Sequence, residues 1–212
     1  MSRLIFVAII AMLSACTAAG RAELSRPEAF DVADATYRVS VECQGGHAGG
    51  GSAVMLQDHV LVTAGHVGTS AWCRYELYQN GTYRGPSWLL KAAAGADLAL
   101  LYTPLTGRTI ELGDPWVGAE VWAAGYPGTP GTGEQQYAVS RGTVASRSGE
   151  VFRVTAPIYH GSSGGGAWDD QGRLVGITVG ALESPGLFGT PVPYDGWYYM
   201  EPADRVSALL EE

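Results

Sequence analysis

Residues 161–165 have the sequence Gly-Ser-Ser-Gly-Gly, and this short segment decides how the whole chain is interpreted. Glycines on both sides let the backbone turn sharply and expose a serine hydroxyl beside free N–H groups. Such N–H groups can stabilise a developing oxyanion by about 2.7–4 kcal/mol per donor. A Gly-Ser run is also typical of a flexible loop. The segment therefore needs support from elsewhere in the chain.

Two further motifs precede this segment. Residues 63–66 (T-A-G-H) follow an apolar strand and end in His66, whose ordinary pKa of roughly 6.5 suits proton transfer at neutral pH. Residues 96–101 (A-D-L-A-L-L) begin an apolar strand with one carboxylate, Asp97, which is costly to bury without a partner. Each motif alone is usually structural. Together, and in this order, they indicate nucleophilic catalysis.

The order of the motifs separates the known arrangements of Ser, His and Asp. Gly161-x-Ser163-x-Gly165 also fits the nucleophile elbow of α/β-hydrolases, where the catalytic histidine follows the serine. All four histidines of this chain precede Ser163. The subtilisin order requires the aspartate first, whereas Asp97 follows His66. The order His-Asp-Ser is the one that remains.

On these motifs the sequence resembles the trypsin-like, chymotrypsin-fold serine proteases, of the compact bacterial type related to the HtrA proteases. The family patterns are T-A-x-H, D-[IL]-A-[LV]-[LI] and G-x-S-G-G, followed by V-G-I, which stands at 175–177. The resemblance covers about residues 36–200. It implies a catalytic triad of His66, Asp97 and Ser163, and an oxyanion hole formed by the N–H groups of Gly161 and Ser163. It also implies an acyl-enzyme intermediate and no metal or organic cofactor.

The fold class follows from turn chemistry together with the resemblance. Glycine (30) and proline (11) are far above the roughly 12% average in this chain of 212 residues, which favours many short strands. We expect an all-β domain at 36–212 with two six-stranded antiparallel β-barrels of the chymotrypsin type, at about 36–105 and 115–200, and a short C-terminal helix at 202–211. Strands are expected near 37–42, 51–56, 60–64, 72–78, 98–102, 120–124, 136–144, 151–156, 165–168, 174–179 and 194–200.

Composition excludes several classes of protein. The formal net charge is −8, and no cluster of Lys or Arg could neutralise phosphates, so nucleic acid is not an expected partner. The hydrophobic content of 46% supports a buried core and argues against disorder.

The N-terminus has the pattern of a targeting segment. The apolar run at 4–13 is too short to span roughly 30 Å of hydrocarbon and predicts a signal peptide at 1–15. Residues 13–16 (L-S-A-C) resemble a bacterial lipobox, which implies lipidation of Cys16, a tether at 16–35 and attachment to a membrane. With Thr17 following, the resemblance favours an exported envelope lipoprotein, at the outer membrane facing the periplasm. The alternative is an ordinary signal peptide with an incidental cysteine.

Two cysteines, Cys43 and Cys73, remain once Cys16 carries lipid. Export favours a disulfide between them, which would close a loop of about 30 residues around His66 and stabilise the fold by about 2–4 kcal/mol. The alternative is two buried thiols. His47 and His59 lack zinc-ligand spacing with these cysteines, so no metal site is expected.

The substrate pocket is expected, from the resemblance, at 157–160 and 178–181. Ile158, Tyr159 and Val179 favour a small or apolar substrate side chain, whereas His160 would favour an acidic one if it is not simply an exposed loop residue. Thr178 is a candidate hydroxyl for support of the triad aspartate. Ser162 stands where digestive relatives carry an aspartate, so activation by insertion of a new N-terminus is not expected.

The sequence thus predicts a monomeric serine endopeptidase acting on protein or peptide substrates. No appended peptide-binding domain is expected after the C-terminal helix. The alternative function is a non-catalytic, protease-fold lipoprotein that serves as a binding or scaffold module of the envelope.

Overall fold

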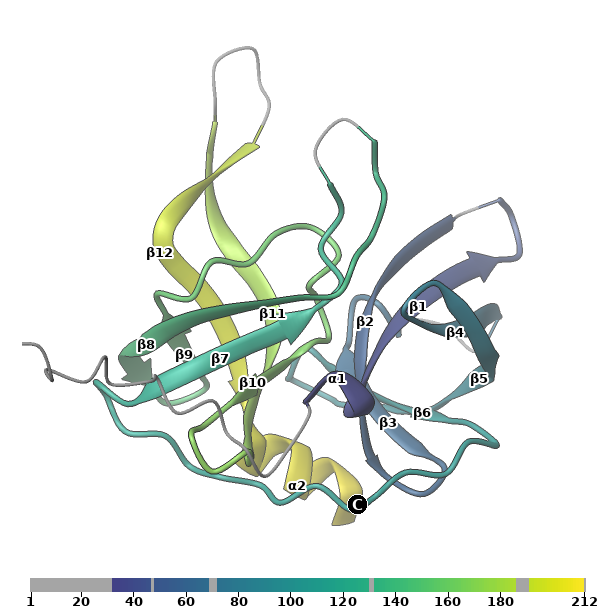
Figure 1. The fold of residues 1–212 in the computed structure, drawn as a ribbon, viewed down its shortest axis with the longest axis horizontal. Coiled ribbons are helices and arrows are strands. Elements are labelled where there is room, and N and C mark those ends of the chain that lie inside the picture. Colours follow the sequence, from purple (N-terminus) through teal and green to yellow (C-terminus); the bar gives the residue numbers. More distant parts are fainter. Residues whose placement is uncertain (1–31, 47, 69–71, 130–131, 186–190, 212) are drawn as a thin grey trace, which may run out of the picture.

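The molecule consists of two closed antiparallel β-barrels (Figure 1). The structure is a computed structural model that describes residues 32–46, 48–68, 72–129, 132–185 and 191–211. The strand order is β1-β2-β3-β6-β5-β4 in the first barrel and β10-β11-β12-β9-β8-β7 in the second. The expected two six-stranded barrels are confirmed. The strands are β1 (Thr36–Cys43), β2 (Ala48–Gln57), β3 (Val60–Ala64), β4 (Cys73–Gln79), β5 (Thr82–Ala92), β6 (Leu98–Tyr102), β7 (Glu120–Gly125), β8 (Ala138–Ser148), β9 (Val151–Val154), β10 (Gly166–Trp168), β11 (Leu174–Pro185) and β12 (Pro191–Pro202).

Two short helices flank the barrels. The helix α1 (Val32–Ala35) is a single turn that leads directly into β1, at the end of the expected tether. The helix α2 (Ala203–Glu211) is the expected C-terminal helix and begins directly after β12. Its buried residues, Ala203, Val206 and Leu209, recur every three positions and so share one face.

The strand β5 was not expected from the sequence. It contains Gly85 and Pro86, and proline removes a ladder hydrogen bond, so the segment lacks the usual strand pattern. The structure nevertheless pairs Pro86 with Glu76 of β4. The carbonyl of Pro86 accepts a hydrogen bond from the Thr103 hydroxyl at 3.1 Å. Its partners on both sides therefore place this segment in the barrel.

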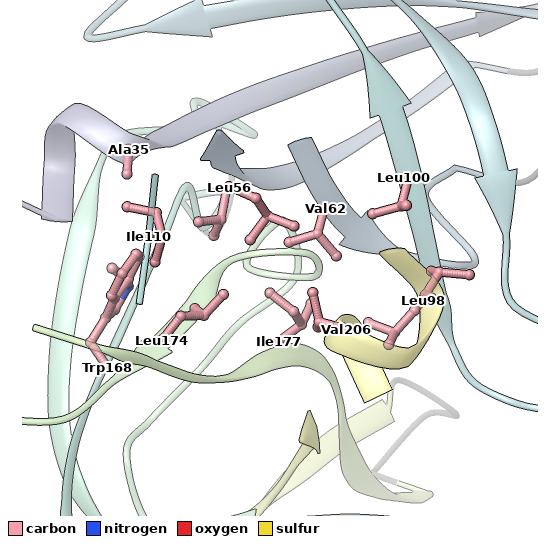
Figure 2. Close-up of a cluster of buried hydrophobic side chains, with 13 residues drawn as sticks. Ala35, Leu56, Val62, Leu98, Leu100, Ile110, Trp168, Leu174, Ile177 and Val206 are labelled. Atoms are coloured by element: carbon pink, nitrogen blue, oxygen red, sulfur yellow. The ribbon is translucent and has the colours of Figure 1, made fainter. Parts of the chain in front are cut away.

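A cluster of apolar side chains lies between the two barrels and fixes them against each other (Figure 2). Val62 and Leu98 come from the first barrel, Trp168 and Ile177 from the second, and Val206 from α2, and none of these five is measurably exposed. Burial of such surface stabilises by roughly 25 cal/mol per Å². Because the two barrels are packed against each other in this way, the loops at their strand ends keep fixed positions relative to each other.

A disulfide joins Cys43, the last residue of β1, and Cys73, the first residue of β4, as the sequence predicted; the two residues are paired across the strands. It closes a loop with a sequence separation of 30 residues.

We expect the double variant Cys43→Ser/Cys73→Ser to lose about 3–4 kcal/mol of unfolding free energy, because its unfolded chain gains loop entropy. Urea unfolding under oxidising conditions measures this loss. Reductant should destabilise the wild type and leave the variant unchanged; a loss below about 1 kcal/mol contradicts the prediction.

Candidate active site

The register of two strands brings His66 and Asp97 together. Ala64, the last residue of β3, lies opposite Leu98, the first residue of β6, so the residues just beyond these ends are neighbours. His66 donates its backbone N–H to Asp97 Oδ1 at 2.7 Å, and its Nδ1 lies 2.7 Å from Asp97 Oδ2. Gly65 permits this approach, since a Cβ there would lie 2.9 Å from Asp97 Oδ1.

This contact shifts both ionisation equilibria. The hydrogen bond from Asp97 raises the pKa of His66 above 6.5; burial opposes the shift and the carboxylate charge adds to it. Burial acts to raise the pKa of Asp97, but the hydrogen bonds from the His66 side chain and backbone outweigh it and leave this pKa below its ordinary value. The two side chains are 49% and 36% exposed, so the carboxylate is less buried than expected. The pair nevertheless favours a charged carboxylate beside a readily protonated imidazole.

The 161–165 segment is an ordered turn between β9 and β10. Ser162 donates its N–H to the Tyr159 carbonyl at 2.9 Å, and Gly165 donates to the Ser162 carbonyl at 2.8 Å. Gly161 and Gly164 have φ angles of +94° and +87°, in the region that favours glycine. Ser162 is only 7% exposed, whereas Ser163 is partly exposed. The hydroxyl that a substrate could reach is therefore that of Ser163.

Within the described residues, the N–H groups of Gly161 and Ser163 have no hydrogen-bond acceptor. These are the two groups that the sequence analysis assigned to an oxyanion hole. The neighbouring N–H groups of Ser162, Gly164 and Gly165 are all engaged. The turn thus leaves free the two donors that such a hole requires.

Contacts between the barrels bring Ser163 to the strand end that carries His66. Ser52 of β2 donates its N–H to the Ser163 carbonyl at 2.7 Å. A Cβ at Gly164 would lie 3.0 Å from the backbone nitrogen of Ala64, two residues before His66. Across the described part of the chain, no hydrogen bond joins Ser163 Oγ to His66 Nε2. Catalytic hydrogen bonds are often long in unliganded sites and tighten when substrate binds.

The expected pocket residues separate into two groups. Ile158 and Thr178 line a cavity of about 230 Å³ that also reaches Ser162. His160 and Val179 are not on its wall: His160 is exposed, and Val179 packs against the core of the first barrel. Of the four residues assigned to one pocket, the structure places two around this cavity.

The predicted support of Asp97 by Thr178 is wrong. The Thr178 hydroxyl donates to Met200 Sδ at 3.3 Å inside the second barrel. The support comes instead from Glu201, which is 4% exposed and accepts the Asp97 backbone N–H at 2.9 Å. The other Glu201 oxygen pairs with Arg205 at 3.2 Å. Nothing in the sequence marks Glu201 as a site residue, because an acidic residue before Pro202 is also typical of a helix start.

Several expectations concern residues outside the described ranges. Cys16, the signal peptide, most of the tether and His47 belong to this group. In the ranges that are described, no cluster of His, Cys, Asp and Glu could hold a metal ion. None of the described helices has the length and apolar character required to span a membrane.

Residues 49–177, more than half of the chain, match the trypsin-like peptidase domain family. The chain therefore belongs to that family. A comparison with curated proteins found no match.

Solved structures show the same fold. The serine endoprotease from Yersinia pestis is 23% identical, with a TM-score of 0.69, and the match covers 85% of this chain and 62% of that one. The HtrA-type protease AlgW, solved with a tripeptide, is 21% identical, with a TM-score of 0.70 and coverage of 85% and 60%. The chain thus spans less than two thirds of these structures' length. They confirm the predicted chymotrypsin-type fold.

Proposed function

We propose that this protein is a serine endopeptidase in which Ser163, His66 and Asp97 act as a catalytic triad. The observation that carries the proposal is the His66–Asp97 hydrogen bond beside a partly exposed serine whose loop keeps two N–H groups free. The motif order, the trypsin-like family and the HtrA-type fold support the same conclusion. The non-catalytic scaffold gives no reason for this combination of groups.

In the proposed reaction, Ser163 Oγ attacks the carbonyl carbon of the scissile peptide bond while His66 Nε2 accepts its proton. The Gly161 and Ser163 N–H groups stabilise the negative oxygen of the tetrahedral intermediate. The imidazolium then gives its proton to the leaving amine, and an acyl-enzyme remains. Water, activated by the same histidine, hydrolyses the ester and restores Ser163. Asp97 holds Nδ1–H and stabilises the imidazolium throughout.

We further propose a preference for substrates with a small or apolar side chain before the scissile bond. Ile158, which lines the cavity beside Ser162, carries this proposal, and none of the residues that line this cavity has a carboxylate that would bind Lys or Arg. A preference for acidic side chains would instead implicate His160, which is exposed and directly precedes residues 161–165, the nucleophile loop. Cleavage of a peptide library separates these two specificities.

A fluorophosphonate probe tests the proposed function, because it phosphonylates only an activated serine. We expect covalent labelling of the folded wild type, mapped by mass spectrometry to Ser163, and none of the Ser163→Ala variant. Heat-unfolded wild type is the control for non-specific reaction. Absence of labelling together with absence of peptide hydrolysis would favour the scaffold alternative.

The pH dependence of kcat/KM should reflect His66 in the free enzyme. Protonated His66 cannot accept the serine proton, so activity should rise with pH and level off above the pKa of His66. Because Asp97 raises this pKa above 6.5, we expect the midpoint above 6.5. In the Asp97→Asn variant the midpoint should move to lower pH. A wild-type midpoint at or below 6.5 contradicts the prediction.

A further inference from the structure

Ser52 is a buried residue of the first barrel that forms hydrogen bonds with the nucleophile loop of the second barrel. Its side chain has no measurable exposure. Its hydroxyl donates to the Gly161 carbonyl at 2.7 Å and accepts the Tyr126 backbone N–H at 2.8 Å. Its own N–H donates to the Ser163 carbonyl at 2.7 Å. One side chain and its backbone thus make three hydrogen bonds to the second barrel.

These hydrogen bonds hold the chain on both sides of a peptide unit that supplies one of the two proposed oxyanion donors. The Gly161 and Ser163 carbonyls lie on either side of the Ser162–Ser163 peptide, whose N–H is one proposed oxyanion donor. With both carbonyls held, rotation of that peptide is restricted. The other donor belongs to Gly161, whose own carbonyl Ser52 holds and whose φ of +94° only glycine adopts easily.

Ser52 is itself held by the strand that leads to His66. The Thr63 hydroxyl donates to the Ser52 carbonyl at 2.7 Å, and Thr63 precedes His66 by three residues. A chain of hydrogen bonds therefore runs from β3 through Ser52 to Gly161. It couples the position of the proposed base to that of the oxyanion donors across the two barrels.

We propose that Ser52 is a positioning residue that sets the geometry of the oxyanion hole. The inference rests on the proposed function, since Ser52 acts through the loop and does not touch substrate. Deleting its hydroxyl frees the Gly161 carbonyl and leaves the Tyr126 N–H, in a residue that is 2% exposed, without its acceptor. The loop should then sample orientations in which the donors no longer converge.

The test compares Ser52→Ala with the wild type on a peptide substrate. Complete removal of one oxyanion donor lowers kcat by roughly 10²–10³-fold, so a misplaced donor should lower it by about 10–100-fold. KM should change less than about twofold, because the hole acts on the tetrahedral state. Affinity for a peptide boronic acid, which forms a tetrahedral adduct with the serine, should fall by a similar factor to kcat.

Two further variants separate positioning from folding. Ser87→Ala is the matched control: Ser87 is 1% exposed in the same barrel, and its hydroxyl has no partner among the described residues. It should keep wild-type kinetics. Ser52→Cys keeps a donor and an acceptor at this position, although the thiol is larger than the hydroxyl and forms weaker hydrogen bonds, so its kcat should lie between wild type and Ser52→Ala. It keeps the test open if Ser52→Ala fails to fold.

Ser52→Ala with wild-type kcat, or with a raised KM and unchanged kcat, would overturn the proposal while the proposed function stands. If Ser52→Ala does not fold, a folded Ser52→Cys with wild-type kcat overturns it equally. A wild type that neither hydrolyses peptide nor labels at Ser163 overturns the proposed function instead.

Discussion

In the Asp97→Asn variant we expect kcat to fall by about 10⁴-fold with little change in KM. Both carboxylate oxygens of Asp97 contact His66, one at the backbone N–H and one at Nδ1, each at 2.7 Å. Asparagine offers one oxygen and one amino group. The backbone N–H can only donate, so the oxygen must remain there and the amino group must face Nδ1.

That arrangement selects the wrong tautomer. With an N–H facing it, Nδ1 must accept a hydrogen bond, and the imidazole proton moves to Nε2. Protonated Nε2 cannot take the proton of Ser163, although every side chain keeps its place. The loss is therefore chemical and not structural, which is why the Asn variant is more informative than an alanine.

Steady-state kinetics on a peptide substrate measure this effect, and the unfolding midpoint establishes that the variant is folded. Asp58→Asn is the matched control. Asp58 is exposed and accepts the Gly107 N–H at 2.9 Å, with no contact to the site. The same change of charge there should leave kcat unaltered. A loss of less than tenfold in Asp97→Asn would remove Asp97 from the proposed triad.

The parts of the site that the sequence could predict have local signals. His66 follows a strand, Asp97 begins one, and glycines surround Ser163, so each motif is visible within a few residues. The order of the motifs then excluded other folds. The antiparallel pairing of β3 with β6 turns two such local signals into one contact, because both residues lie just beyond the same end of the pair.

The missed parts have no local signal. Ser52 lies in the strand expected near 51–56, but nothing near it in the sequence marks a polar role, and its partner Gly161 lies 109 residues away. The assignment of Thr178 failed for a related reason: side chains alternate between faces, so an uncertainty of one residue changes the side to which a hydroxyl points. Only the docking of the barrels defines which buried polar groups meet, and no pattern of strands encodes it.

The close contact between the two barrels also predicts that the small substitution Gly164→Ala is strongly damaging. A Cβ at Gly164 would lie 2.0 Å from the Ser52 carbonyl oxygen and 2.2 Å from Thr63 Oγ1. Its φ of +87° adds the cost of a left-handed conformation, about 1–2 kcal/mol, to an overlap that typically costs about 1–3 kcal/mol. We expect a loss of about 2–5 kcal/mol of unfolding free energy, measured in urea.

Gly81→Ala isolates the overlap from the backbone strain. Gly81 has a similar φ of +77°, but nothing lies within 4 Å of the position that its Cβ would occupy. It should lose only the left-handed cost, about 1–2 kcal/mol, and keep full activity. Gly164→Ala should lose activity as well, because relief of the clash must move either the nucleophile loop or Ser52. Equal losses in the two variants would show that the barrels do not meet at Gly164 as the structure places them.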